Sequence, residues 1–476
     1  MIDVTEENNL KMHGGIWGGL IPLIILITIL FGLSLGGKGG VKSFWIAGWL
    51  AIVVGMFFAK NKSIYCASVM KGLGDKNGII IVTAWLFAGV FGKLMVAGGL
   101  VDGLRWFGLR TGATGALFSL ISFIAAMIFS MGTGTSTGTV LSLIPVLYPA
   151  GVFLGANPII LAVGILSGAA FGDNLAPISD TTIVSAYTQE ANMRDVVRSR
   201  FPLAITAAFF SALIILFSGG GGEITPGFEV QARIDPFGLL MLVSFAIVVI
   251  SALFGRHLVE SLIYGNVSAI ILGFINGYIR LDEIFRIPSE RGESTGVIQD
   301  GMSSVVGAIV FALLMLAITQ ILIDSGVLEK ILKKVEKTIV KTVRQAELFI
   351  IFITIFASIP IASNAAAELL VGPGLVNPLG KKFNLAPARR ANLMDCAVCT
   401  IYFNIPWHIA VVVWYGAVQS AAEGFHLPEM PITASFLNPY SWTLLVVLLF
   451  SIFTGWNRRL SINELIFGKG KNGKCE

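Results

Sequence analysis

The chain has 476 residues and a formal net charge of +5; 55% of its residues are hydrophobic and 13% are charged. Soluble domains contain about 25% charged residues, and the four cysteines are too scattered for a disulfide framework. The composition therefore excludes a soluble enzyme and a disulfide-rich secreted domain. With a mean hydropathy of +0.82, the sequence predicts an all-α polytopic membrane protein in a lipid bilayer.

Apolar runs long enough to cross about 30 Å of hydrocarbon as a helix recur along the chain. The connections between them are too short to hold a catalytic domain, so we expect no enzymatic activity. In chain order, the predicted spans are residues 17–34, 44–59, 78–100, 112–131, 201–217, 237–253, 258–277, 302–323, 348–361, 394–418 and 442–453.

Basic residues crowd the connections that follow the spans ending at residues 59, 323 and 453. Residues 219–235 and 421–431 are instead acidic or nearly uncharged. By the positive-inside rule, the carboxyl terminus and the basic connection around Lys330 face the cytoplasm, and residues 457–476 form a cytoplasmic tail. We interpret the basic loops as topology signals and expect no nucleic-acid partner.

The fourth predicted span runs into a series of small hydroxyl residues, GTGTSTGTV, at Gly132–Val140. Such a segment can pack helices closely through small residues, or it can unwind so that its oxygens line a site. Its position directly before two short apolar arms favours the second alternative. We expect a re-entrant hairpin near 133–157, with a turn at residues 149–151.

The next apolar run, near 159–186, is interrupted by GDNLAPISDTT at Gly172–Thr182. This segment places two carboxylates, Asp173 and Asp180, among amide and hydroxyl groups in apolar surroundings. An ionised Asp at the bilayer centre costs at least about 2.5 to 3.5 kcal/mol, so we expect both side chains to face an internal cavity and a cation. The alternative role for Asp180 is to cap the helix that resumes at Thr181.

The pattern recurs later in the chain. We interpret it as an internal duplication whose hairpins enter from opposite faces and meet near the midplane as inverted repeats. The prolines of the first copy correspond to prolines 229 residues later: Pro149, Pro158 and Pro177 to Pro378, Pro387 and Pro406. The predicted organisation is a first repeat half at 1–218, linking spans at 219–301 and a second half at 302–456. The second half contains a hairpin near 362–386 and a broken helix near 390–418.

A cation site at these aspartates would use hard oxygen ligands, which suit Na⁺ and suit soft metals poorly. A buried carboxyl holds either a proton or a small cation, and this competition is the minimal machinery of cation/proton exchange. Asp395, in the second broken helix, is expected to pair with Arg389 or Arg390. The predicted ion-binding residues are Asp173, Asp180, Asn174, Ser179, Thr181, Thr182, Thr135, Ser136 and Thr137.

GDNLAPISDTT resembles the signature of the NhaC-type sodium/proton antiporter family, in which Gly-Asp, Ser/Ala-Pro and Ser-Asp-Thr-Thr follow one another at the same spacing. The resemblance extends to the preceding GTSTGT run. It implies a scaffold domain and a mobile transport domain of inverted repeats, an elevator-type movement and a homodimer in the inner or plasma membrane of a prokaryote. It also assigns Na⁺ to Asp173 and Asp180 and implies no cofactor apart from the transported Na⁺.

Ser363 and Asn364 resemble the Ser-Asn hairpin tips that bind Na⁺ and substrate in carboxylate carriers of the same superfamily. Together with Asn404 and His408 they form the predicted substrate-binding set. Two functions stay open: exchange of Na⁺ for H⁺, and Na⁺-coupled symport or exchange of a small carboxylate or amino acid. A channel or an intramembrane enzyme fits less well, because the sequence offers neither a continuous polar pore lining nor a nucleophile with its general base.

Overall fold

The structure is a computed structural model that describes residues 10–35, 41–74, 76–111, 115–177, 179–222, 235–254, 256–287, 294–327, 340–361, 363–425 and 427–458. Within these ranges the chain is mainly helical and forms no strand beyond two isolated β-bridges, which confirms the all-α prediction. The helices are α1 (Ile16–Leu35), α2 (Val41–Phe58), α3 (Lys62–Leu73), α4 (Lys76–Ala97), α5 (Leu100–Thr111), α6 (Gly115–Thr133), α7 (Ser136–Phe153), α8 (Pro158–Leu175), α9 (Asp180–Thr188), α10 (Met193–Ser218), η1 (Pro236–Leu240), α11 (Met241–Leu253), α12 (Leu258–Ile275), α13 (Leu281–Ile284), α14 (Val297–Asp324), α16 (Val343–Ser358), α17 (Asn364–Val371), η2 (Gly372–Val376), α18 (Asn377–Lys382), α19 (Pro387–Ile401), α20 (Ile409–Phe425), η3 (Ile432–Leu437) and α21 (Pro439–Thr454).

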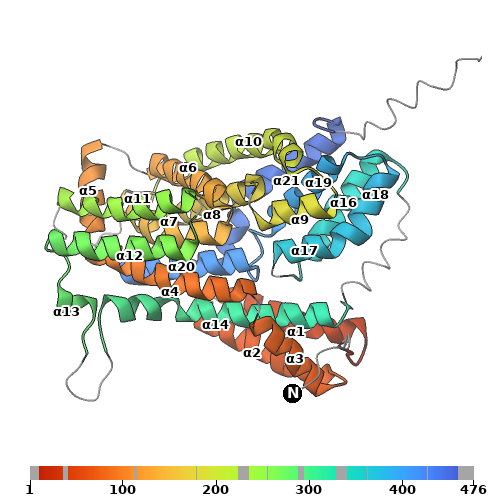
Figure 1. Ribbon diagram of the computed structural model, residues 1–476, viewed down its shortest axis with the longest axis horizontal. Coiled ribbons are helices and arrows are strands. Elements are labelled where there is room, and N and C mark those ends of the chain that lie inside the picture. The colour runs from red at the N-terminus through yellow and green to blue at the C-terminus, as the bar shows by residue number, and fades with distance from the viewer. Residues whose placement is uncertain are drawn as a thin grey trace, which may run out of the picture.

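Most of the long helices lie along the long axis of the molecule (Figure 1). In the described part of the chain, five helical segments are long and apolar enough to cross a membrane, and shorter apolar helices accompany them: the five are Gly115–Thr133, Ser136–Phe153, Pro158–Thr188, Met193–Ser218 and Val297–Asp324. These lengths and compositions fit a multi-pass membrane protein. Most of the predicted cytoplasmic tail, from residue 459 onward, lies outside the described residues.

The segment at 133–157 differs from the expected pair of short arms. α7 is one helix that passes through Pro145 and Pro149 without a turn, as prolines can do where neighbouring helices satisfy the freed backbone groups. The helical path breaks instead at Gly134, whose φ of +66° favours glycine. Thr135 then caps α7, because its hydroxyl accepts a hydrogen bond from the Gly138 N–H at 3.3 Å.

The helices of the second half begin and end at positions that correspond to the first. α17, η2 and α18 form one helical path, with a π turn at Gly372–Val376. Adding 229 to the bounds of α7, 136 and 153, gives 365 and 382, and this path runs from 364 to 382. The same offset takes the first residues of α8 and α9, 158 and 180, to those of α19 and α20, 387 and 409. These helix bounds therefore correspond to within one residue.

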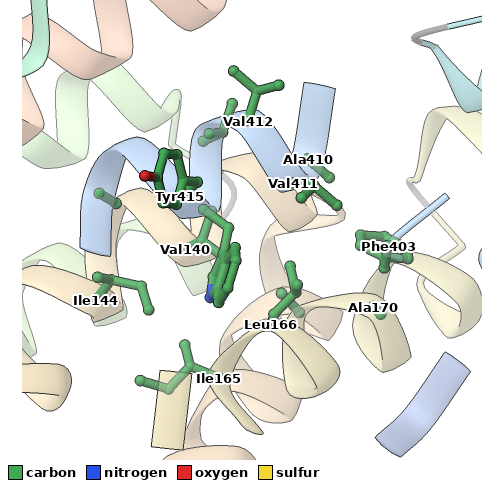
Figure 2. Close-up of a cluster of buried hydrophobic side chains, with 14 of the residues drawn as sticks. Val140, Ile144, Ile165, Leu166, Ala170, Phe403, Ala410, Val411, Val412 and Tyr415 are labelled. Carbon is green, nitrogen blue, oxygen red and sulfur yellow. The ribbon is translucent and has the colours of Figure 1, made fainter. Parts of the chain in front are cut away.

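Each broken helix ends in contact with the other half of the chain. α20 packs against α7, and Figure 2 shows its residues Val411 and Tyr415 in one apolar cluster with Val140 of α7 and Leu166 of α8. The Trp414 indole N–H also donates to the Ala162 carbonyl at 2.8 Å. α9 in turn packs against α17 and α19. In Figure 1, α20 accordingly lies with α7 at the left and α9 with α17 at the right.

The carboxyl-terminal part of α8 is fixed by a close approach to α6. A Cβ atom at Gly172 would lie against the Ser130 side chain, and one at Gly168 against the Phe123 carbonyl. The Ser130 hydroxyl donates to the Ala169 carbonyl at 2.7 Å. Small residues allow such contact between helices in membranes, and here they position the end of α8 that carries Asp173.

Candidate functional site

The interruptions in the helices bring several helix ends to one place. Asp173, one turn before the break after α8, contacts the amino-terminal residues of three other helices: Ser136 of α7, Ser179 before α9 and Asn364 of α17. The amino terminus of a helix carries a partial positive charge. These ends therefore offset part of the cost of burying a carboxylate, without supplying a full positive charge.

The Asp173 carboxylate is 2% exposed and accepts hydrogen bonds only from neutral groups among the described residues. Ser179 Oγ donates to Oδ1 at 2.7 Å, and Ser136 Oγ donates to Oδ2 at 3.0 Å. Asn364 Nδ2 lies 3.4 Å from Oδ2. The sequence-predicted residues Ser136, Ser179 and Asn364 are thus brought together around Asp173.

Asp180, unlike Asp173, is an exposed residue. Its Oδ1 accepts a hydrogen bond from the Thr181 N–H at 2.9 Å, at the start of α9. The carboxylate thus binds a free N–H in the first turn of α9, as in the capping alternative, although the N-cap residue itself is Ser179. Thr135 and Thr137, also predicted ligands, contact each other at 3.0 Å between their hydroxyls, beside the start of α7.

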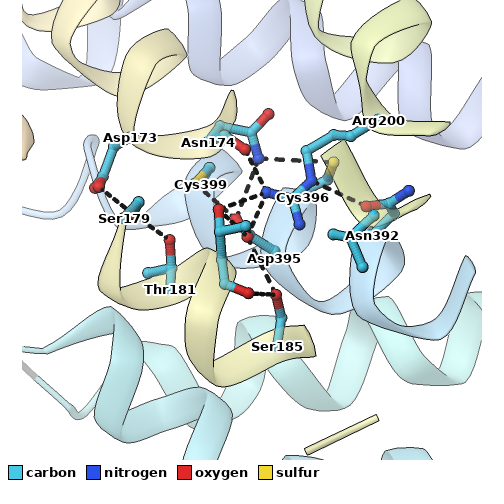
Figure 3. A network of polar contacts seen from close by, with 12 residues as sticks. Asp173, Asn174, Ser179, Thr181, Ser185, Arg200, Asn392, Asp395, Cys396 and Cys399 are labelled. Atoms are coloured by element: carbon cyan, nitrogen blue, oxygen red, sulfur yellow. Dashed lines mark hydrogen bonds and ion pairs between the residues drawn. The ribbon is translucent and has the colours of Figure 1, made fainter. Parts of the chain in front are cut away.

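A second cluster surrounds Asp395, and Figure 3 shows it next to Asp173. Arg200 Nη1 of α10 lies 2.5 Å from Asp395 Oδ2, and both side chains are fully buried. The predicted ligands Asn174 and Thr182 belong to this cluster, because Asn174 Nδ2 and Thr182 Oγ1 lie 3.2 and 3.3 Å from the Asp395 carboxylate. Ser185 Oγ also donates to Oδ2 at 3.3 Å.

The predicted pairing of Asp395 with Arg389 or Arg390 is wrong, because both arginines have other partners. Arg389 Nε lies 2.8 Å from Oε1 of Glu347 on α16, and Arg390 donates to the carbonyls of Leu385 and Gln189. One turn of α19 separates these arginines from Asp395, and their side chains lead to α16 and α9. Arg200, which sequence reasoning missed, reaches Asp395 from a different helix.

The four predicted substrate-binding residues do not form one group. Ser363 caps α17 through a 3.4 Å contact with the Ala366 N–H, and Asn364 reaches Asp173. Asn404 Nδ2 donates to the Thr400 carbonyl at 2.9 Å. The His408 ring nitrogens lie 2.9 and 2.8 Å from the carbonyls of Tyr402 and Ser358, and the ring stacks on Tyr402. Both ring nitrogens of His408 are thus engaged by the backbone at the second break.

Glu368 is a further buried acid that sequence reasoning missed. It is 0% exposed, and no hydrogen-bond partner reaches either of its carboxylate oxygens among the described residues. It lies one turn after Asn364 on α17. A Glu inside the apolar run NAAAELLVG is the signal that could have identified it.

The donor set of the centre fits a hard monovalent cation better than a soft metal. Across the described ranges, no group of three or more His, Cys, Asp and Glu side chains is arranged to hold a metal ion. The available ligands are single carboxylates with hydroxyl, amide and carbonyl oxygens, which suit hard cations.

Interrupted helices that place buried carboxylates inside an apolar bundle define a class of membrane transport proteins. The profile described as the Na+/H+ antiporter family matches residues 12–220 and 236–455. This match covers most of the chain, which therefore belongs to the Na⁺/H⁺ antiporter family, a family of Na⁺-coupled transporters. The sequence-based family prediction is confirmed.

Several proteins of known name are similar to the chain. The malate-2H⁺/Na⁺-lactate antiporter of Bacillus subtilis is 27% identical over 210 residues, which cover 44% of this chain and 43% of that protein. The chain thus matches less than half the length of this relative. The Na⁺/H⁺ antiporter NhaC of Alkalihalophilus pseudofirmus is 22% identical over 347 residues, 70% of this chain and 72% of the relative. Among solved structures, the YdaH transporter of Alcanivorax borkumensis is 16% identical with a TM-score of 0.38, covering 81% of this chain and 88% of that one.

Proposed function

We propose that the protein exchanges Na⁺ for H⁺ across the membrane, with Asp173 as the principal Na⁺-binding carboxylate. One observation carries this proposal: Asp173 is buried among neutral donors from three interrupted helices. A carboxylate in such surroundings needs a bound cation or a proton to balance its charge. A cycle in which Na⁺ leaves Asp173 when a proton binds to an acidic side chain of the buried centre then couples the two fluxes.

Asp180 is proposed as the entry ligand of the same site. As an exposed residue at the start of α9, it is placed to attract a cation before the ion reaches Asp173, which is buried. The hydroxyls of Ser136 and Ser179 would turn their oxygens toward the ion when it replaces their hydrogen bonds to Asp173. Thr135, Thr137 and Thr181 belong to the same helix starts and complete the proposed ion path, with Asn174 and Thr182 as the link to Asp395.

The proposed mechanism uses inverted repeats in a mobile transport domain. Two observations support this proposal. The helix bounds of the two halves correspond under the 229-residue offset, and in Figure 1 α6 and α7 lie to the left of α9 whereas α16 and α18 lie to its right. In this scheme α7–α10 and α16–α21 carry the site past a scaffold that contains α1–α4 and α14. The elevator movement, the homodimer, the prokaryotic membrane and a cytoplasmic carboxyl terminus stay predictions.

The alternative is Na⁺-coupled transport of a small carboxylate or amino acid on the same fold. It is favoured by the position of Asn364 beside Asp173 and by the name of the Bacillus relative, a malate/lactate antiporter. Against it, His408 and Asn404 make their contacts with backbone carbonyls. We therefore place Na⁺/H⁺ exchange first.

The test uses the purified full chain in liposomes that contain a pH-sensitive dye. External Na⁺ is added alone and then with a panel of carboxylates and amino acids. A Na⁺-driven pH change without any organic solute, absent in Asp173→Asn, is the expected result. A response that begins only when one solute is present would replace the exchange proposal with Na⁺-coupled solute transport.

A further inference from the structure

Glu368 lies on a polar face of α17 that leads from Asp173 toward an end of the molecule. Asn364, Glu368 and Gly372 are spaced four residues apart, so they share one side of this helix and its continuation. Asn364 contacts Asp173 at one end. At the other end, Gln189 Nε2 donates to the Gly372 carbonyl at 3.2 Å. Glu368 therefore sits between the Asp173 centre and the end of α9.

The end of α9 continues this polar face to an exposed pair. Asn377 Nδ2 donates to the Thr188 carbonyl at 2.8 Å and lies 3.4 Å from Glu190 Oε1. Glu190 in turn pairs with Lys381 at 2.7 Å, and both side chains are more than half exposed. Polar groups at the end of α9 and on α18 thus extend from Gly372, one turn after Glu368, to an ion pair exposed to water.

Among the described residues, no basic side chain forms an ion pair with Glu368. The charged groups that act on it are Asp395 of α19, Arg200 of α10, Asp180 of α9 and Asp173 of α8, and Arg200 is bound to Asp395. α16 also packs against α17; its buried acid, Glu347, pairs with Arg389 and Arg458. An ionised carboxylate in this position would face other acids without a donor among the described residues, which is strongly unfavourable.

A proton suits Glu368 better than a metal cation does. A bound Na⁺ needs several oxygen ligands, and the hydroxyl and amide groups of the centre gather around Asp173 and Asp395 instead. We infer that Glu368 is the proton-carrying carboxyl of the exchange cycle, a site separate from the Na⁺ site at Asp173 and connected to water along α17 and α9. This inference rests on the proposed Na⁺/H⁺ exchange.

The test separates Na⁺ binding from proton coupling in the same liposomes. Exchange of radioactive Na⁺ for unlabelled Na⁺ requires no net proton movement, whereas the dye signal does. Glu368→Gln mimics the protonated side chain, so it should keep Na⁺/Na⁺ exchange and lose Na⁺-driven proton movement. Asp173→Asn should lose both, and Glu423→Gln, the same change at an exposed position of α20, should lose neither.

Two results would overturn the inference. In the first, Glu368→Gln still exchanges Na⁺ for H⁺ at the wild-type rate. In the second, Glu368→Gln is folded but loses Na⁺/Na⁺ exchange, as Asp173→Asn does. If Glu368→Gln does not fold, the pH profile of Na⁺/H⁺ exchange by Glu368→Asp tests the inference instead. It keeps a carboxyl but moves it, so its exchange should persist with a shifted pH profile, and an unshifted profile would contradict the inference. Absence of Na⁺-driven proton movement in the wild type would refute the proposed exchange itself, which is a different result from failure of the Glu368 variants alone.

Discussion

Two buried aspartates lie close together in the polar centre but have different surroundings. Asp395 is paired with the guanidinium of Arg200 at 2.5 Å, whereas Asp173 receives only hydroxyl and amide donors among the described residues. A permanent counter-ion makes Asp395 a structural link between α10 and α19. Asp173 has no such counter-ion among the described residues, and this difference is the reason why we propose Asp173, and not Asp395, as the ion-binding group.

The largest expected effect is that of Asp173→Asn on transport. The amide keeps an acceptor for the serine hydroxyls but cannot balance a cation, so Na⁺-driven proton movement and Na⁺ exchange should both be lost. The free energy of unfolding should change by only about 1 kcal/mol. Transport assays in liposomes and thermal unfolding in detergent check the two parts.

Asp195→Asn, an identical change at an exposed position in the first turn of α10, is the matched control and should transport normally. Wild-type transport by Asp173→Asn would remove the proposed role of Asp173 and with it the contrast between the two aspartates.

Arg200→Gln should have the opposite profile, with stability as its main defect. Removing one partner of a buried ion pair leaves the other uncompensated and costs about 3 to 5 kcal/mol. We expect a lower unfolding midpoint and a lower yield of folded protein, measured by fluorescence and size-exclusion chromatography.

The double variant Arg200→Gln, Asp395→Asn tests the cause of that defect. It removes both charges and should recover part of the lost stability. A double variant that is less stable than Arg200→Gln would show that the ion pair is not what the single change disrupts.

Gly172→Ala should have an intermediate effect. The new methyl group would press against Ser130 of α6, and overpacking of this kind costs about 1 to 3 kcal/mol. The end of α8 should shift and displace Asp173, so Na⁺ should bind there more weakly and its transport should slow. The Asp395–Arg200 pair should be retained. Thermal unfolding and the apparent Na⁺ affinity provide the measurements, with Gly374→Ala, where a Cβ meets open space, as the control.

Glu190→Gln is expected to have the smallest effect. Lys381 holds the pKa of Glu190 below its ordinary value through a hydrogen bond and its charge. A lowered folded-state pKa gives stability that is present above the unfolded pKa and is lost as the pH falls through the folded pKa. This exposed pair is screened by solvent, so the unfolding midpoint at neutral pH should be almost unchanged. A large loss of stability would indicate a structural role for the α9–α18 contact beyond this ion pair.

The part of the site that is formed by residues close in sequence could be predicted from the sequence. Small hydroxyl residues, Gly134 and the GDNLAPISDTT run predicted the breaks, because such residues interrupt helices in apolar surroundings. Ser179 lies six residues from Asp173, so its contact follows from one short segment. The family resemblance also followed from this segment and agrees with the family match.

The long-range part could not be derived from the sequence. Arg200 and Asp395 are 195 positions apart, and both adjacent arginines, Arg389 and Arg390, were nearer in sequence to Asp395. Which guanidinium pairs with Asp395 depends on how α10 packs against α19. The continuous α7 was unpredictable for a related reason: prolines terminate isolated helices, but the packed neighbours of α7 compensate for them.

The exchange of broken-helix ends between the two halves has a consequence for synthesis. The face of α8 that carries Leu166, and the Ala162 carbonyl that accepts from Trp414, are covered by the second half of the chain. The equivalent region of that half emerges 229 residues later, on the order of 10 to 50 s at ribosomal rates of about 5 to 20 residues per second. During that interval the first half stands in the membrane with its central surface uncovered. In the nascent chain, lipid or the insertion machinery therefore has to cover this surface of α8 until α20 has been synthesised.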